Sequence, residues 1–139
     1  MATWCICFNV KYFNIVKAIE DDKNIYLKKN ASISEDDTVY IYVSRPFSKL
    51  LYKAKVMAGQ YDETVMSSLE TYISIPLDTL KKGIYYRLKI EGEFLTDSTY
   101  YKMIMKKGMS TIQGPSRARP SLINYLKELE KKTYEYMEI

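Results

Sequence analysis

The chain has 139 residues, of which 47% are hydrophobic and 27% charged, and its 21 basic and 17 acidic side chains give a formal net charge of +4. This length and composition predict one soluble globular domain, residues 1–139, and exclude a disordered chain. No apolar run approaches the about 18 residues of a spanning helix, and no signal peptide precedes the first strand. We therefore expect a cytoplasmic protein without a membrane partner.

The chain lacks the groups that most enzyme classes need. It has no histidine, so Ser-His, Cys-His and most zinc chemistry lose their usual participant. Its five glycines show no phosphate-loop spacing, and the acids at 21–22 and 35–37 lie beside turn residues as solvated charges. Cys5 and Cys7 are expected to be small buried thiols on one face of a strand. We therefore expect no catalysis, no metal and no cofactor.

Tyrosine is the unusual excess, with 14 residues against 4 phenylalanines and 1 tryptophan. Its ring has a flat apolar face and its hydroxyl is polar, which suits wet contact surfaces as well as strand interiors. The basic bias is local, because seven basic and three acidic residues between Arg87 and Arg119 give +4 there, equal to the net charge of the whole chain. This mild bias permits a polyanionic partner without requiring one.

The first part of the chain alternates strand and helix signals. Residues 3–8 have no breaker and predict a buried strand. A helical spacing of apolar residues follows over about 12–21, after a loop that contains Asn9. Residues 22–37 predict a polar connection with an apolar centre at 25–27, and a loop of that length in a small domain is often functional.

A hairpin is predicted next, with strands near 39–43 and 50–58 joined by the turn Ser-Arg-Pro-Phe at 44–47. Tyr40 and Tyr42 alternate with three β-branched residues along the first strand. Because both sets are large or apolar, we expect protein on both faces of this strand.

The second part of the chain begins with a weak pattern over 61–82, where we expect a loop, a short strand and a turn without a function. Residues 84–95 predict another strand, with Leu88, Ile90 and Phe94 pointing inward. We expect this strand, near 85–95, to lie in one curved sheet or barrel with the strands near 3–8, 39–43 and 50–58.

Two helices are predicted near the end of the chain. Residues 97–108 start with Asp97 or Ser98 as N-cap and end with Gly108, and residues 121–132 carry an apolar stripe. Residues 125–136 are expected to be the polar face of the closing helix. The order of elements predicts an α+β domain, with a strongly curved sheet or small β-barrel flanked by helices.

Three ordered segments resemble a known family. They are the hairpin 39–56, the strand, loop and helix of 4–19, and the Gly-Pro-x-Arg turn of 112–117 followed by a helix over 122–126. Together they resemble EVE domains, members of the PUA-like superfamily and structural relatives of the YTH readers. The resemblance implies a PUA-like, EVE-type fold, and residues 60–82 have no counterpart in it.

The chain departs from the family at two places. Residues 36–37 read Asp-Asp where the family commonly has Gly-Asp. The tryptophan that helps to wall the ligand pocket is also missing, because the alignment places Leu27 at that position with Tyr26 beside it. Either Tyr26 substitutes for the missing ring, or the base pocket has changed or been lost.

The resemblance implies a reader of a modified base in DNA, or of RNA as in related PUA-like and YTH domains. Such domains are often the N-terminal specificity part of modification-dependent restriction proteins, which would make a motor or nuclease a partner. The chain has no motor motif, so we expect a stand-alone reader or an excised specificity domain.

A pocket for a flipped base needs an aromatic or apolar wall, donors and acceptors for the base edge, and cations for the flanking phosphates. The residues expected in the base pocket are Asn9, Tyr12, Tyr26, Leu27, Asn30, Tyr42 and Ser44. The residues expected to bind phosphate are Lys28, Lys29, Arg45, Arg117 and Arg119.

Several of these residues have a structural alternative. Tyr42 can be a core residue, Asn9 can cap the loop before the helix, and Arg117 can hold the last helix. Lys28 and Lys29 can be a solvated pair. The function also has an alternative, because tyrosine-rich surfaces suit a protein-interaction module on the same scaffold, for example in a phage or host-defence factor.

Overall fold

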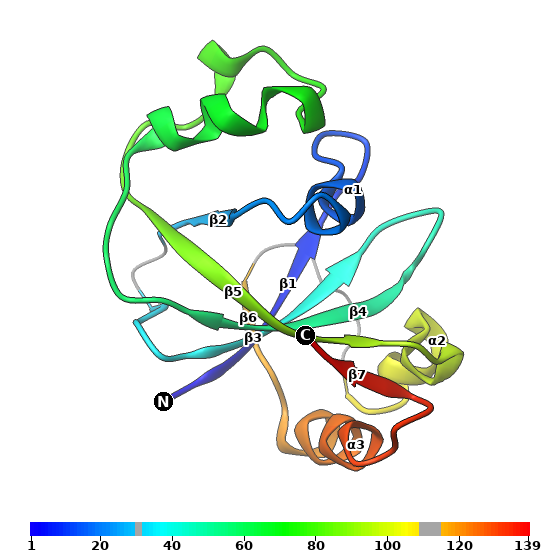
Figure 1. The fold of residues 1–139 in the computed structure, drawn as a ribbon. Coiled ribbons are helices and arrows are strands. Elements are labelled where there is room, and N and C mark those ends of the chain that lie inside the picture. The colour runs from blue at the N-terminus through cyan, green and yellow to red at the C-terminus, as the bar shows by residue number, and fades with distance from the viewer. Residues whose placement is uncertain (30–31, 109–114) are drawn as a thin grey trace.

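The computed structural model describes residues 1–29, 32–108 and 115–139, and within these ranges seven strands form one sheet (Figure 1). The strands are β1 (Thr3–Phe8), β2 (Ile25–Lys28), β3 (Thr38–Val43), β4 (Lys49–Val56), β5 (Tyr85–Phe94), β6 (Ser116–Arg117) and β7 (Tyr136–Glu138). Their order is β2-β5-β4-β3-β1-β6, and β7 pairs with β5. The sheet therefore joins strands from both halves of the chain, as predicted.

Helices and 3-10 turns lie around this sheet (Figure 1). The α-helices are α1 (Ile15–Glu20), α2 (Tyr101–Met105) and α3 (Pro120–Glu130), and the 3-10 segments are η1 (Glu63–Tyr72), η2 (Leu77–Thr79) and η3 (Asp97–Thr99). None of the helices in the described ranges has the length and apolar character that crossing a membrane requires.

The sheet is mixed and strongly curled. β1 runs parallel to β3, whereas the other neighbouring strands are antiparallel. Irregularities in the register lie between Ile41 and Tyr42 on β3 and between Lys53 and Ala54 on β4. Because such bulges bend a strand and increase its twist, they help the sheet to curl into a half-barrel. The predicted α+β architecture with a curved sheet is confirmed.

Both faces of the central strands are buried, as the pattern of β3 predicted. Val39, Ile41 and Val43 join the core that includes α1, while Tyr40 joins a second core under α3. On β1 the same alternation places Trp4 in the first core and Cys5 in the second, since successive side chains of a strand point to opposite faces. The core that includes α1, which we call the inner core, thus contains aliphatic and aromatic residues, and the core that includes α3, which we call the outer core, covers the other face.

The outer core confirms the apolar stripe of the last helix, with Leu122, Leu126 and Leu129 buried. Leu88 and Ile90 belong to the inner core as predicted, but Phe94 belongs to the outer core. The register shift between β4 and β5 accompanies this change of face along β5.

Three segments differ from the sequence prediction. The polar connection contains β2, the weak segment forms η1 and η2 instead of a strand, and the closing helix ends at Glu130. Asp62 caps η1 by accepting the amide of Thr64 at 3.0 Å. Residues 136–138 form β7 against β5, so they are not part of a helix face.

The first helix is shorter than the predicted range of 12–21. The backbone amides of Tyr12 and Phe13 both bond to the Asn9 carbonyl at 3.0 Å, which forms a turn before the helix. Asn14 then caps α1 by accepting the Lys17 amide at 3.2 Å. A side-chain acceptor at this position satisfies a free amide of the first turn, so the helix begins there.

The segment 97–108 is a 3-10 turn followed by a short helix. Thr96, not Asp97 or Ser98, is the cap, because its hydroxyl accepts the Ser98 amide at 3.1 Å. Gly108 has φ of +95°, the left-handed conformation expected of a glycine that ends a helix.

Candidate functional site

The end of the β3–β4 hairpin is a tight turn over residues 44–48. The amides of Phe47 and Ser48 bond to the Ser44 carbonyl at 3.1 and 3.4 Å, and the Arg45–Pro46 peptide bond is cis. Phe47 packs against the inner core, while Arg45 and Pro46 are exposed. The turn is therefore anchored on one side and presents a cation to solvent on the other.

The segment before α2 docks onto this turn. The Tyr101 amide donates to the Ser48 carbonyl at 2.9 Å, and the buried Thr99 hydroxyl donates to the Leu50 carbonyl at 2.7 Å. Tyr100 forms an antiparallel bridge with Lys49. These main-chain contacts place two consecutive tyrosines beside the hairpin end, about fifty residues away in sequence.

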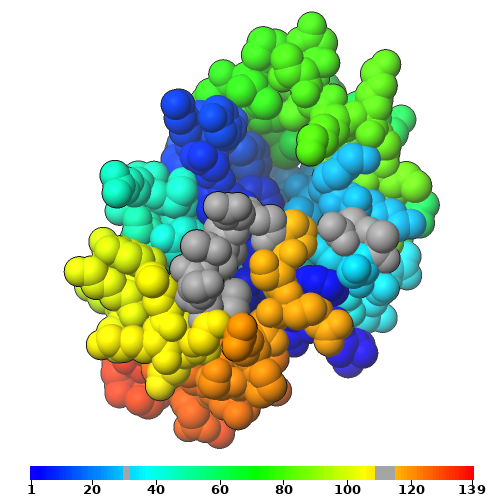
Figure 2. Space-filling model, turned by 180° about the vertical axis from the view of Figure 1, so that it is seen from behind, coloured from blue at the N-terminus to red at the C-terminus, as the bar shows by residue number. Residues whose placement is uncertain are grey.

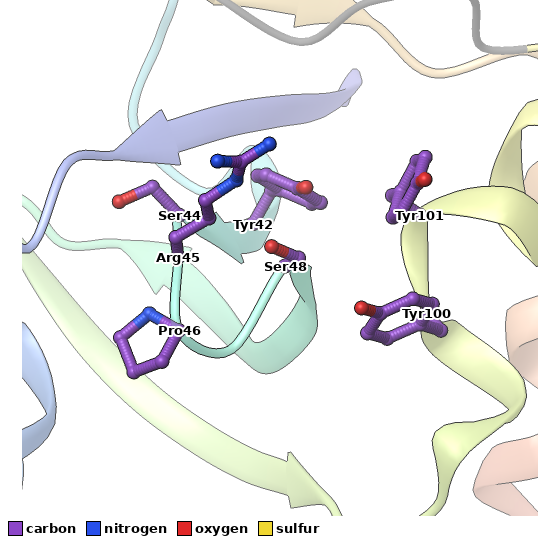
Figure 3. A pocket seen from close by; sticks show the side chains of 7 residues that line it. All are labelled: Tyr42, Ser44, Arg45, Pro46, Ser48, Tyr100 and Tyr101. Atoms are coloured by element: carbon purple, nitrogen blue, oxygen red, sulfur yellow. The ribbon is translucent and has the colours of Figure 1, made fainter.

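A hollow of about 880 Å³ lies between the two segments. We call it the tyrosine hollow, and its lining residues are Tyr42, Ser44, Arg45, Pro46, Ser48, Tyr100 and Tyr101. Figure 3 shows Tyr100 and Tyr101 on one side and Tyr42, Arg45 and Ser48 on the other. Its volume is in the range of small-molecule sites, which span about 300–1,000 Å³.

The aromatic groups of the tyrosine hollow are accessible. Tyr100 and Tyr101 are 38% and 36% exposed, and their ring centroids lie 5.1 Å apart at an angle of 50°. Tyr42 is half-buried, and burial raises the pKa of its hydroxyl while a hydrogen bond with Ser48 opposes that shift. The hollow therefore offers flat apolar faces and hydroxyl groups next to the Arg45 guanidinium.

Asn9 and Ser44 hold the hairpin end to the loop after β1. The Ser44 hydroxyl accepts the Val10 amide at 3.0 Å and donates to the Asn9 side-chain oxygen at 3.4 Å. The same Asn9 oxygen accepts the Lys11 amide at 3.0 Å, so Asn9 shapes its own loop. Because these atoms are engaged within the protein, Ser44 keeps little capacity for a base edge. Tyr12 is 49% exposed beside Lys11 and does not line the tyrosine hollow.

Tyr26, Leu27 and Lys28 lie at the opposite end of the sheet. β5 pairs with β2 over Tyr85 to Leu88, beyond the point where Val56 ends β4, whereas the hairpin turn lies at the other end of β4 (Figure 1). The register therefore keeps β2 away from the tyrosine hollow. Tyr26 and Leu27 were expected to converge with Ser44 around one concavity, but only Ser44 lines this hollow.

The β2 side chains have local partners instead. The Tyr26 ring packs edge-on against Tyr61 at 5.5 Å, and Leu27 packs on the inner core. The Lys28 ammonium donates to the Lys82 carbonyl at 2.9 Å. Lys29 follows the strand and is exposed. Asn30 lies outside the described residues.

Arg117 and Arg119 lie on the segment between β6 and α3. The Arg117 guanidinium stacks over the Trp4 ring at 5.2 Å, and Arg119 is exposed just before α3. A side chain added at Gly108 would meet the aliphatic part of Arg119, and the Ser121 hydroxyl donates to the Lys107 carbonyl at 2.7 Å. The end of the α2 segment and the start of α3 are therefore neighbours.

Cations from several elements gather on one face. Figure 2 shows the hairpin end, residues 97–108 and the start of α3 on the same side of the molecule. The basic residues of these segments that have no ion pair with another described residue are Arg45, Lys102, Lys106, Lys107, Arg117 and Arg119. The sequence prediction had three of these cations in the site and missed the three lysines near α2.

Among the described residues, no three or more His, Cys, Asp or Glu side chains lie together so that they could hold a metal ion. Cys5 is buried, and burial raises the pKa of its thiol to about 12. A thiol with so high a pKa is protonated at neutral pH and is a poor nucleophile.

The fold is shared with proteins of known structure. The ASCH protein from Zymomonas mobilis has a TM-score of 0.63 and 14% identity to this chain, with 92% of this chain and 95% of that chain covered. A single-residue variant of the same protein gives the same TM-score and identity over 93% and 99%. ASCH domains belong to the PUA-like superfamily, so the chain has an ASCH-like, PUA-like α+β fold.

Sequence comparisons add nothing to this result, since no family model and no curated protein match the chain. The predicted PUA-like fold is confirmed by this structural similarity. The narrower EVE assignment is not shown, because the similar structures described above are of an ASCH protein.

Proposed function

We propose that this protein is a cytoplasmic, non-catalytic reader of nucleic acid that takes one unstacked base into the tyrosine hollow. The observation that carries this proposal is the pair of exposed tyrosines facing the hairpin end across an open hollow, with Arg45 at its edge. A base that leaves its stack needs a replacement for its neighbours, and tyrosine faces provide one.

The surrounding charges support the same proposal. Nucleic-acid phosphates follow each base, so a base site needs cations beside it and not within it. Arg45 lies at the edge of the hollow, and the unpaired cations of 102–119 lie on the adjoining segments. A strand that inserts a base between Tyr42 and Tyr101 could therefore place its phosphates on these groups.

The first ligand to test is a modified base in DNA, which is what the EVE resemblance implies, and the alternative is single-stranded RNA. In the restriction setting that the resemblance suggests, a motor or nuclease would act on the DNA that this reader marks. Fluorescence anisotropy with modified and unmodified duplexes and single strands, at several salt concentrations, separates these ligands. A preference that survives high salt indicates base recognition, while salt sensitivity alone indicates phosphate contact.

The decisive variant is Tyr101→Ala. Loss of one stacking ring should weaken binding by about 1–3 kcal/mol, roughly 5- to 150-fold, at every salt concentration. Tyr134→Ala is the matched control, because Tyr134 is 73% exposed and lies outside the tyrosine hollow. Equal affinity of the wild type and Tyr101→Ala, with both proteins folded, would refute the proposed base site.

A second function has one specific observation in its favour. Met103 and Met105 are 37% and 48% exposed next to the two tyrosines, and such a patch also suits protein recognition. Under this hypothesis Tyr101→Ala would weaken capture of a protein partner. The oligonucleotides would show no salt-dependent binding.

A further inference from the structure

A second hollow, of about 330 Å³, is lined by residues of the α1–β2 loop and of β5. We call it the basic hollow, because Lys23, Arg87 and Lys89 line it together with Asp22, Asn24 and the terminal residue Ile139. It shares no lining residue with the tyrosine hollow. It is therefore a separate site in the described part of the chain.

Arg87 gives the strongest indication of a ligand. Its side chain is half-buried on β5, and its Nε atom is buried without a hydrogen-bond partner in the part of the chain that the structure describes. Leaving a charged donor buried and unpaired is unfavourable, so such an atom calls for an acceptor. The guanidinium fork matches the paired oxygens of an oxyanion.

The neighbouring lysines lack acceptors as well. Lys89 lies directly opposite Lys55 in the pairing of β4 and β5, and like charges facing each other across strands repel. Neither of these lysines nor Lys23 forms an ion pair with another described residue. An anion in the hollow would relieve this repulsion.

The carboxylates at the hollow do not perform this task. Asp22 and the terminal residue Ile139 both line the hollow, but neither carboxylate forms an ion pair with the three cations. The backbone of Asp22 is held at φ of +58° by the turn that ends α1, where its amide bonds to the Ile19 carbonyl at 3.0 Å. The neighbouring Asp21 is engaged by Lys17 and by the Tyr72 hydroxyl.

We infer that the basic hollow binds a phosphate group, with Arg87 as the fork and Lys23 and Lys89 as flanking charges. A dianionic tetrahedral group has enough oxygens to meet all three cations, and the Asn24 amide adds a neutral donor. The phosphate can come from a small molecule or from a nucleic-acid backbone, and the experiment must separate these two sources.

The test is a ³¹P NMR titration of the whole chain with inorganic phosphate, together with thermal unfolding in phosphate and in chloride at equal ionic strength. Wild type should show saturable binding and a higher unfolding midpoint in phosphate. Arg87→Gln should lower phosphate affinity about tenfold, as expected for a lost charge-assisted hydrogen bond. Lys127→Gln, an exposed charge loss on α3, should bind phosphate like wild type.

Arg87→Gln can fail to fold, so Lys23→Gln/Lys89→Gln is the second variant, which keeps Arg87 and changes two less buried lysines. It should also lose phosphate affinity. Equal unfolding midpoints of wild type in phosphate and chloride, or wild-type affinity in both variants, would overturn the inference.

Oligonucleotide binding separates the two sources. If Arg87→Gln lowers the salt dependence of oligonucleotide binding, the phosphate belongs to a nucleic-acid backbone. If oligonucleotide binding is unchanged while inorganic phosphate binding is lost, the site takes a small phosphorylated molecule. The Tyr101→Ala protein should keep its phosphate response in either case, so failure of the base-reader proposal leaves this test intact.

Discussion

The buried Asp37 carboxylate ties the N-terminus to the start of β3. It is 3% exposed and accepts the Ala2 amide, the Trp4 indole and the Ser34 amide at 2.9, 2.9 and 3.0 Å. Asparagine at position 37 would direct its side-chain NH₂ group, a hydrogen-bond donor, toward these N–H donors. We expect Asp37→Asn to lower the free energy of unfolding by about 3 kcal/mol at neutral pH, measured by urea denaturation.

The effect of Asp37 should depend on pH. Burial acts to raise the pKa of Asp37, but the bonds from Ala2, Ser34 and Trp4 outweigh it, so the folded pKa lies below its usual value. A lowered folded pKa stabilises the protein above the unfolded pKa of about 3.9, and this stabilisation is lost as pH falls through the folded value. The stability difference between wild type and Asp37→Asn should therefore shrink between about pH 5 and pH 2. A difference that is constant over this range would contradict the assignment.

At the same scale, the sequence predicted only the local half of the candidate site. Tyr42, Ser44 and Arg45 are close together in sequence, and a turn signal alone placed them at the hairpin end. Tyr100 and Tyr101 join them through the main-chain contacts of Ser48 and Leu50, which depend on long-range docking. In the sequence, these two residues are only a pair of consecutive tyrosines after a predicted helix cap. Such a pair does not indicate which distant segment it will contact.

Among the elements, β7 pairs with β5 and places a tyrosine ring over a glycine of that strand. A side chain at Gly92 would overlap the Tyr136 ring, which lies across it from β7. We expect Gly92→Ala to cost about 2 kcal/mol of stability, since overpacking forces a backbone or side-chain shift. Adding Tyr136→Ala should cost less in the Gly92→Ala background than in wild type. Additive costs in this double-mutant cycle would show that the two residues do not meet.

The α3 helix is attached to the sheet by a half-buried polar cluster. Glu130 accepts the Tyr40 hydroxyl at 2.7 Å and the Lys53 ammonium at 2.6 Å. Glu130→Ala would leave both donors without an acceptor, and we expect a loss of about 3 kcal/mol in chemical denaturation. Glu128→Ala is the control on the same helix, because its pair with Lys131 is exposed and should contribute within about 0.5 kcal/mol. Equal losses in the two variants would refute this role of Glu130.

The sequence predicted an element correctly where that element is long and its apolar residues are regularly spaced. β1, β3, β4, β5 and α3 were predicted because each buries a regular set of apolar positions. β2 and β7 have four and three residues and exist because β5 offers free edges to pair with. η1 repeats near three residues per turn, a period that matches neither the helix nor the strand pattern.

For the whole molecule, the two predicted pairs of cations belong to different strands of the sheet. Arg117 stacks on Trp4 of β1 and Arg119 lies near Gly108 after α2, while Lys28 and Lys29 are at the end of β2, which pairs with β5. The sequence prediction placed all four around one nucleic acid, and only the segment of Arg119 is shown to meet the end of the α2 segment. The two pairs carry the same charge, so they form a matched comparison.

Neutralising either pair removes two charges, and only the pair that contacts phosphate should change the salt dependence of binding. We expect Arg117→Gln/Arg119→Gln to weaken oligonucleotide binding and to reduce the slope of log affinity against log salt by about 1.4–1.8, because each lost contact removes about 0.7–0.9. Lys28→Gln/Lys29→Gln should leave the slope unchanged. Circular dichroism of the arginine variant must match wild type, since Arg117 also stacks on Trp4. A reduced slope in the lysine variant and a wild-type slope in the arginine variant would move the phosphate path to β2 and refute the tyrosine hollow as its centre.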